Sequence, residues 1–136
     1  MNILTIRSDN PEAEIGLFEI SGSNISSIPK DYKKWQAHRR LSETLLPSID
    51  EMLTVSSLSL KDIEGIIIFS GPGSFTGLRI GISTANALAF GLSIPIIGSQ
   101  GDDWLETGLK KIVTHSNDRI VIPHYGAPVH ITQPKK

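Results

Sequence analysis

Residues 70–83, SGPGSFTGLRIGIS, follow the apolar run GIIIF at 65–69 and decide how the rest of the chain is interpreted. Glycine, proline and hydroxyl residues between two apolar segments are typical of a tight turn followed by the start of a helix. The wholly apolar residues 66–69 are typical of a strand buried in a parallel sheet. We expect a helix over 75–91 and a further strand, IPIIG, at 94–98. Strand, helix and strand at this spacing predict a βαβ unit, which is right-handed in nearly all proteins.

The turn does not contain a complete phosphate-binding motif. A Walker loop ends in Gly-Lys-Ser/Thr, whereas Gly77 is followed by leucine. The dinucleotide fingerprint Gly-x-Gly-x-x-Gly fits Gly71 and Gly73, but its third position is Thr76. Free backbone N–H groups at a helix start still attract anions, so Gly73, Ser74 and Thr76 are candidate phosphate contacts. The alternative is a plain N-cap, in which the hydroxyl of Ser74 or Thr76 satisfies the same donors.

Small residues recur at every fourth position along the helix expected after the turn. They are Gly77, Gly81, Ala85 and Ala89. Because glycine inside a helix costs about 1 kcal/mol relative to alanine, we expect this stripe to allow the close approach of another backbone. Two neighbours are possible: this chain's own sheet or helix, or a helix of a second protein.

The residues before the turn predict three strands and one long helix. Short apolar segments at 3–6, 15–20 and 25–28 are separated by polar residues, which is typical of an antiparallel meander. The spacing then changes to a helical repeat, and an amphipathic helix is expected over 34–54. Its apolar stripe contains Ala37, Leu41, Leu45, Ile49 and Leu53.

Composition excludes several classes of protein. The chain has 136 residues, 39% of them hydrophobic, and a formal net charge of −1, which suits one domain and gives no electrostatic footprint for nucleic acid. It contains no cysteine, so disulfides, thiolate metal sites and thiol catalysis are excluded. Polar residues interrupt residues 1–10 and the apolar stretch 80–98. We therefore expect neither a signal peptide nor a membrane span, and a soluble cytoplasmic protein.

Histidines and basic residues form no catalytic or metal-binding pattern. His38, His115, His124 and His130 contain no His-x-x-x-His pair, and the chain has no Gly-x-Ser-x-Gly nucleophile elbow. We therefore expect no catalytic residue, no metal and no cofactor. The only basic cluster, YKKW and HRR within residues 32–40, is expected to be solvated, with a weak RNA contact inside an assembly as the alternative.

Four segments together resemble the TsaB family of bacteria. They are GPGSFTGLRIG (71–81), the apolar strand before it, LSETLLPSIDEML (41–53) and IPIIG, and the similarity covers residues 1–98. The resemblance implies an actin-like, ribonuclease-H-like (ASKHA) α/β lobe, with a mixed five-stranded sheet in βββαβαβ order and flanking helices. It also implies a non-catalytic subunit that supports threonylcarbamoyladenosine modification of tRNA at the adenosine next to the anticodon.

The resemblance further implies specific partners. Proteins of the family pair with TsaD, the catalytic paralogue, through the two helices that follow the third and fourth strands, and they also form a homodimer. TsaE, an ATPase, joins the pair, TsaC makes the threonylcarbamoyl-adenylate, and tRNA is contacted only indirectly. On this sequence the expected interface residues are Leu41, Leu45, Ile49, Gly77, Leu78, Gly81 and Ala85. Two alternatives stay open: a small nucleotide-binding or hydrolysing enzyme that uses the 71–77 loop, and a homodimeric regulator unrelated to tRNA.

Two departures from the family affect the details. The family's first strand normally ends in Asp-Thr-Ser, but this chain has Arg7, Ser8 and Asp9. The cation removes a metal ligand, although Arg7 could itself contact a phosphate. The second departure is length, because only residues 99–136 follow the lobe at 1–98, where the family has a second lobe. We therefore expect no interlobe cleft that encloses a nucleotide.

The extension at 99–136 is predicted to contain little regular structure. DDWLETGLKKI at 102–112 favours a short helix, whose acidic start suits the helix dipole. RIVI at 119–122 favours a last strand, and the remainder, rich in proline and glycine, is expected to be irregular.

Overall fold

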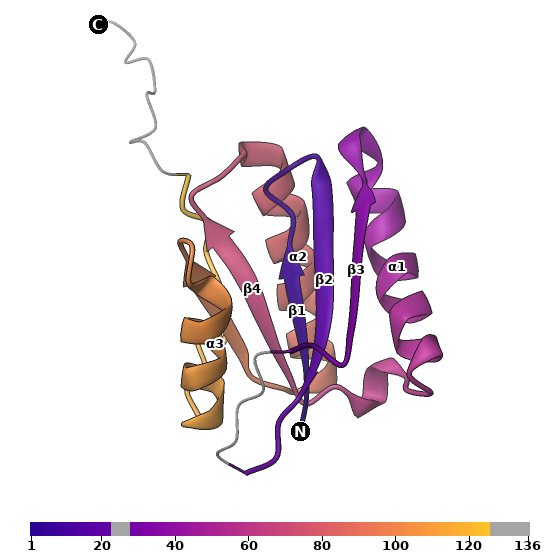
Figure 1. The fold of residues 1–136 in the computed structure, drawn as a ribbon. Helices are drawn as coiled ribbons and strands as arrows, with labels where there is room; N and C mark the ends of the chain where they lie inside the picture. The colour runs from indigo at the N-terminus through magenta and orange to yellow at the C-terminus, as the bar shows by residue number, and fades with distance from the viewer. Residues whose placement is uncertain (23–27, 126–136) are drawn as a thin grey trace, which may run out of the picture.

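The sheet of this chain combines an antiparallel meander with a parallel βαβ unit. In the computed structural model, which describes residues 1–22 and 28–125, the strands follow the order β3-β2-β1-β4-β5 (Figure 1). The strands are β1 (Asn2–Arg7), β2 (Glu12–Glu19), β3 (Asp31–Gln36), β4 (Gly65–Gly71) and β5 (Ile96–Gln100). The helices are α1 (Leu41–Val55), α2 (Phe75–Leu92) and α3 (Trp104–Val113), with 3-10 turns at His38–Arg40 and Leu60–Asp62.

Strand pairing follows from the connections between the strands. β2 pairs antiparallel with β1 and with β3, because short segments join these strands. β4 pairs in parallel with β1 and with β5, since α1 returns the chain before β4 and α2 returns it before β5. The mixed five-stranded sheet in βββαβαβ order, predicted from the sequence, is confirmed.

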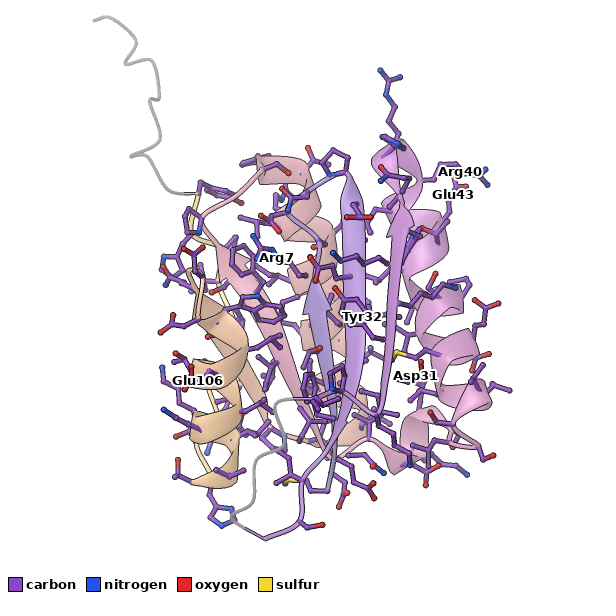
Figure 2. The ribbon with its side chains drawn as sticks, in the orientation of Figure 1. Arg7, Asp31, Tyr32, Arg40, Glu43 and Glu106 are labelled. Carbon is purple, nitrogen blue, oxygen red and sulfur yellow. The ribbon has the colours of Figure 1, made fainter. Side chains whose placement is uncertain are left out.

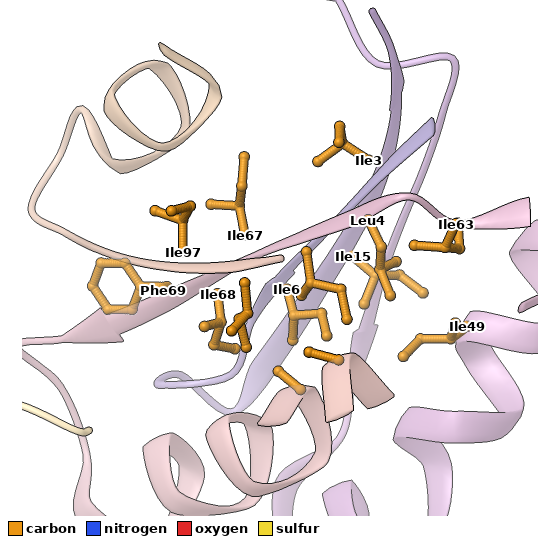
Figure 3. Close-up of a cluster of buried hydrophobic side chains, with 14 of the residues drawn as sticks. Ile3, Leu4, Ile6, Ile15, Ile49, Ile63, Ile67, Ile68, Phe69 and Ile97 are labelled. Carbon is orange, nitrogen blue, oxygen red and sulfur yellow. The ribbon is translucent and has the colours of Figure 1, made fainter. Parts of the chain in front are cut away.

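Two helices cover one face of the sheet, and the third covers part of the other. Figure 3 shows Leu4, Ile6 and Ile68 on the face above α1 and α2, and Ile67 and Ile97 on the face toward α3. All five side chains are 0% exposed. α3 packs mainly on β4 and β5. The apolar run of β4 is therefore buried from both sides, as expected of a central parallel strand.

The third strand lies further along the chain than the sequence predicted. The predicted strand at 25–28 falls largely outside the described residues, and Ile28 is 75% exposed. β3 instead contains residues that the helical repeat had assigned to the helix at 34–54, so that start of the helix was wrong. Pairing with β2 decides the outcome, because Trp35 lies opposite Ala13 and its Nε1 donates to Thr44 Oγ1 on α1 at 2.9 Å.

The last predicted strand, at 119–122, is also wrong. Ile120 is 70% exposed and has no strand partner in the part of the chain that the structure describes. The segment contacts β5 mainly through side chains: the N–H of Ile96 donates to Asn117 Oδ1 at 3.1 Å, and the N–H of Gly98 donates to Asp118 Oδ2 at 2.8 Å. One backbone hydrogen bond, from the N–H of Asp118 to the carbonyl oxygen of Ile96 at 2.8 Å, adds to them. The helix predicted at 102–112 is confirmed as α3.

Candidate functional site

The carboxyl ends of the parallel strands β1, β4 and β5 meet at one edge of the sheet. In open α/β sheets ligands bind at this edge, because the loops that follow the strands surround a crevice there. In this chain the loops begin at Ser8, Pro72 and Gly101. The candidate phosphate contacts predicted from the sequence, Arg7, Gly73, Ser74 and Thr76, all lie in or next to these loops.

Arg7 is bound to Asp9. Its Nε donates to Asp9 Oδ1 at 2.8 Å, and its Nη2 donates to Asp9 Oδ2 at 3.2 Å. The guanidinium also lies 4.0 Å from the centroid of the Phe69 ring. The hydrogen bond to Asp9 raises the pKa of Arg7 more than partial burial lowers it. Arg7 and Asp9 thus neutralise each other at the end of β1, and Arg7 as a phosphate contact stays a prediction.

Ser74 and Thr76 line a cleft of about 460 Å³ that does not include Arg7. The cleft lies between the β1–β2 turn, the connection from β3 to α1, and the first turn of α2. Ser74 occupies the N-cap position of α2, but its side chain makes no capping hydrogen bond. The N-cap alternative is therefore right about the position of Ser74 but not about its capping hydrogen bond, and both residues line the cleft.

The glycine stripe of α2 packs against this chain's own β1–β2 turn. The hydroxyl of Ser8 donates to the carbonyl oxygen of Gly77 at 2.7 Å. A Cβ at Gly77 would collide with the carbonyl oxygen of Ser8, and one at Gly81 would collide with the Ser8 hydroxyl. Gly73 faces Asp9 with the same lack of space. The sequence left two possible neighbours for the stripe, another part of this chain or a helix of a second protein. In the structure another part of this chain packs against it.

The apolar residues predicted for a partner interface form part of the core. Leu41, Leu45 and Ile49 are 4%, 1% and 0% exposed. Leu78 is 0% exposed, and Ala85 is equally buried. The sequence analysis placed these residues on the side that faces a partner. They are buried instead, because the apolar stripe of α1 faces the sheet. An interface through the two helices stays a prediction, and other residues of these helices must form it.

The outer sides of α1 and α2 carry exposed apolar residues that the sequence analysis did not assign to an interface. Leu46 on α1 is 48% exposed, and Phe90 near the end of α2 is 88% exposed. Both lie beside buried residues in the sequence, Leu45 and Ala89, and fall outside the helical repeat. A large apolar residue outside the buried stripe of an amphipathic helix is the sequence signal that could have identified Leu46 and Phe90 as exposed.

A polar pair lies on the opposite face of the sheet. Figure 2 shows Arg7 and Tyr32 on the side of the strands that α1 does not cover. The Oη of Tyr32 donates to Glu14 Oε1 at 2.5 Å across the β2–β3 pair. Burial and this hydrogen bond raise the pKa of Tyr32. Among the described residues, no group of three or more histidines and acids could hold a metal, and no helix is long and apolar enough to cross a bilayer.

Comparison with known proteins identifies the relatives of this lobe. Residues 35–100 match the model of the family TsaD, tRNA N6-adenosine threonylcarbamoyltransferase. Over 89 residues, 60% of the chain, it is 37% identical to the tRNA threonylcarbamoyladenosine biosynthesis protein TsaB of Escherichia coli (strain K12). Over 61 residues, 45% of the chain, it is 44% identical to TsaB of Haemophilus influenzae. These matches support a TsaB-family chain that covers part of those proteins.

This TsaB-family chain spans only part of its relatives: 38% of the Escherichia coli protein and 26% of the Haemophilus influenzae protein. It is also 47% identical over 62 residues to the tRNA N6-adenosine threonylcarbamoyltransferase of Geotalea daltonii, covering 46% of this chain and 18% of that protein. The solved structure of YeaZ from Pseudomonas aeruginosa superposes with a TM-score of 0.63 at 23% identity, over 73% of this chain and 43% of that one. The predicted actin-like lobe is confirmed.

Proposed function

We propose that this chain is a non-catalytic subunit of the machinery that makes threonylcarbamoyladenosine in tRNA, and that it pairs there with the transferase subunit TsaD. The observation that carries the proposal is the chain's relation both to TsaB proteins and to the transferase, whose family model matches residues 35–100. These residues contain α1, β4, α2 and β5. Two proteins that share one helical layer can pair through equivalent surfaces about a pseudo-twofold axis, as isologous interfaces do.

The outer sides of α1 and α2 are the surface proposed for this pairing. Leu46 and Phe90 are apolar and exposed there, and Pro47 and Ala87 are exposed on the same helices. A few residues carry most of the energy of an interface, and covering exposed apolar surface is favourable. These outward residues take the place of the inward-facing leucines that the sequence predicted.

The residues at the carboxyl edge of the sheet support the proposal that this subunit is not catalytic. Arg7 stands where the catalytic relatives of this fold are expected to have an acid, and Asp9 is bound to Arg7 by two hydrogen bonds. Ser74 and Thr76 line a cleft without Arg7, so the candidate phosphate contacts do not converge on one point. We therefore expect the isolated protein to show no ATPase or peptidase activity.

The remaining partners follow from the same role. In the absence of TsaD, a homodimer would use the same helical surface. TsaE and TsaC belong to the same pathway, and TsaE would act on the TsaD-containing pair. Cytoplasmic localisation follows from a tRNA substrate.

The pairing is tested by co-expression with TsaD of the same organism and affinity capture. Phe90→Glu and Leu46→Glu place a charge on the proposed surface, and we expect each to weaken TsaD binding at least about tenfold, as loss of a dominant contact does. Both side chains are exposed, so the melting temperature should stay close to that of the wild type.

Lys111→Glu is the matched control, because Lys111 is exposed on α3, on the opposite face of the sheet. It should bind TsaD like the wild type. Failure of the wild-type chain to capture TsaD, or normal capture by both surface variants, would contradict the proposed pairing.

A further inference from the structure

The face of the sheet that α3 covers only in part contains a pocket of about 300 Å³. It lies between the start of α3 and the strands β1, β2 and β3. Its walls are mostly apolar: Trp104 and Leu105 come from α3, and Phe18 comes from β2. Sites for small molecules are concave and mostly apolar, contain a few polar groups that fix the ligand, and begin at volumes of about 300 Å³. The pocket therefore has the size and lining of a site for a small ligand.

Gly16 leaves room at the floor of this pocket. It lies opposite Thr5 on β1 and opposite Tyr32 on β3. A Cβ at Gly16 would lie 2.7 Å from Thr5 Oγ1, 3.4 Å from the Phe18 ring and 3.7 Å from the Tyr32 ring. Because these three residues all line the pocket, their side chains surround the space above Gly16.

The hydroxyl of Thr5 is a polar group that a ligand can reach. Thr5 is only 3% exposed, yet its hydroxyl has no hydrogen-bond partner among the described residues. Every fully enclosed polar side-chain atom of the described residues does have such a partner. The Thr5 oxygen is therefore not fully enclosed, and the pocket is the space that leads to it. A ligand that bonds to this hydroxyl restores the hydrogen bond that the fold leaves unmade.

Glu14, which also lines the pocket, has one carboxylate oxygen without a partner. Its Oε1 accepts from the Oη of Tyr32 at 2.5 Å, and within the described residues its Oε2 makes no hydrogen bond or ion pair. Glu14 is the diagonal neighbour of Thr5 across the β1–β2 pair. Diagonal neighbours lie about 7–8 Å apart, within reach of long side chains, so one group of a ligand can contact both residues.

The charge of Glu14 is not balanced by its neighbours. The residues directly across the strands are Arg7 on β1 and Lys34 on β3. Arg7 is paired with Asp9 at 2.8 Å. Lys34 is paired with Glu12 at 3.9 Å. These two pairs are each neutral, so Glu14 brings one net negative charge to the pocket.

An ammonium group matches this arrangement. It is a cation with three donors and no acceptor, and the pocket offers it two acceptors, the free oxygen of Glu14 and the hydroxyl of Thr5. The rings of Tyr32 and Trp104 also attract cations. An anionic ligand would be repelled by Glu14, while the apolar walls favour a ligand whose remainder is an aromatic ring.

We propose that this pocket binds a small arylalkylamine, an aromatic ring that a short alkyl chain joins to an ammonium group. The ammonium donates to Glu14 and Thr5, and the ring packs on the apolar walls. The inference goes beyond the proposed pairing with TsaD and does not rest on it. The pocket lies on the face of the sheet with Tyr32 (Figure 2), whereas α1 and α2 cover the other face.

Titration with 2-phenylethylamine tests the proposal, with the two indole N–H signals of the protein followed by NMR. Trp104 lines the pocket, whereas Trp35 bonds to Thr44 on α1, at the other face. We expect the Trp104 signal to shift to saturation in the millimolar range and the Trp35 signal to stay in place. 2-Phenylethanol has a similar shape but no charge, and it should bind about tenfold more weakly, because hydrogen bonds between charged groups are stronger than neutral ones.

Two variants remove one acceptor each. Glu14→Gln keeps an oxygen for Tyr32 and removes the charge, and it should weaken binding of the amine about tenfold. Thr5→Val keeps the shape of the side chain without its hydroxyl, and a loss of about two- to tenfold is expected. Glu12→Gln is the matched control, because Glu12 lies on the same face of β2 but does not line the pocket. It should bind the amine like the wild type.

Melting curves should show that the three variants are folded. A Trp104 signal that does not move, or that moves only together with Trp35, would overturn the proposed site. Equal affinities for the amine and the alcohol, or for the wild type and Glu14→Gln, would overturn the ammonium contact. Glu14→Gln should still capture TsaD, so weakened amine binding with normal capture supports a site separate from the pairing surface.

Discussion

The two faces of the sheet are built differently. Under α1 and α2 the face is apolar and closed, and Leu4, Ile6 and Ile68 are fully buried there. On the other face α3 packs mainly on β4 and β5, so Glu14 is only partly buried and Tyr32 is exposed. Figure 2 shows Tyr32 on this face. Close packing makes the first face sensitive to single atoms, while exposed polar pairs contribute little. The difference shows that the closed face under α1 and α2 holds the fold, while substitutions on the half-open face should be better tolerated.

The largest effect is expected from Leu45→Ala on the closed face. Leu45 is 1% exposed, and removal of a buried leucine side chain leaves a cavity that typically costs about 2–5 kcal/mol. Chemical denaturation should show this loss in the free energy of unfolding. Leu46→Ala, one position along on the outer side of α1, should change it by less than about 0.5 kcal/mol, and equal losses would break the comparison.

Gly77→Ala should have the next largest effect. The added methyl group would meet the backbone carbonyl of Ser8, which cannot rotate away as a side chain can, so we expect a loss of about 2 kcal/mol from overpacking. Gly91→Ala on the same helix has open space around it. It should lose nothing and gain up to about 1 kcal/mol from helix propensity. A Gly77→Ala protein as stable as the wild type that fails to bind TsaD would return this position to a partner interface.

The smallest effect is expected on the half-open face, from Tyr32→Phe. At neutral pH the lost hydrogen bond to Glu14 should cost less than about 1 kcal/mol. Because the folded state raises the pKa of Tyr32 above its unfolded value near 10, the tyrosine's contribution is complete below about pH 10 and falls as the pH rises toward the folded pKa. Denaturation curves from neutral to alkaline pH should therefore show the wild-type advantage over Tyr32→Phe shrinking above about pH 10.

The βαβ unit could be predicted from sequence because its determinants are local. The apolar run of β4, the glycine turn and the small-residue repeat of α2 each have a spacing that only one element satisfies. β3 could not be predicted in this way. Lys34 and Trp35 fit a helix start as well as a strand, and only pairing with β2 decides between them.

The orientation of the residues expected at the interface could not be predicted from the sequence. A helical repeat shows that Leu41, Leu45 and Ile49 share a face, yet the same pattern results whether a sheet or a partner covers that face. Glycine spacing likewise indicates a close neighbour without naming Ser8. The Arg7–Asp9 pair depends on how the chain turns after β1, which two letters in a sequence do not specify.

The side chains of Asn117 and Asp118 have a consequence for solubility. An open strand edge is a template on which another molecule can add a strand, and this is a common start of aggregates and fibres. Here the N–H groups of Ile96 and Gly98 already donate to these two side chains, so an incoming strand would have to displace them before it could pair with β5. These two side chains thereby hinder the addition of a strand at the β5 edge of the sheet.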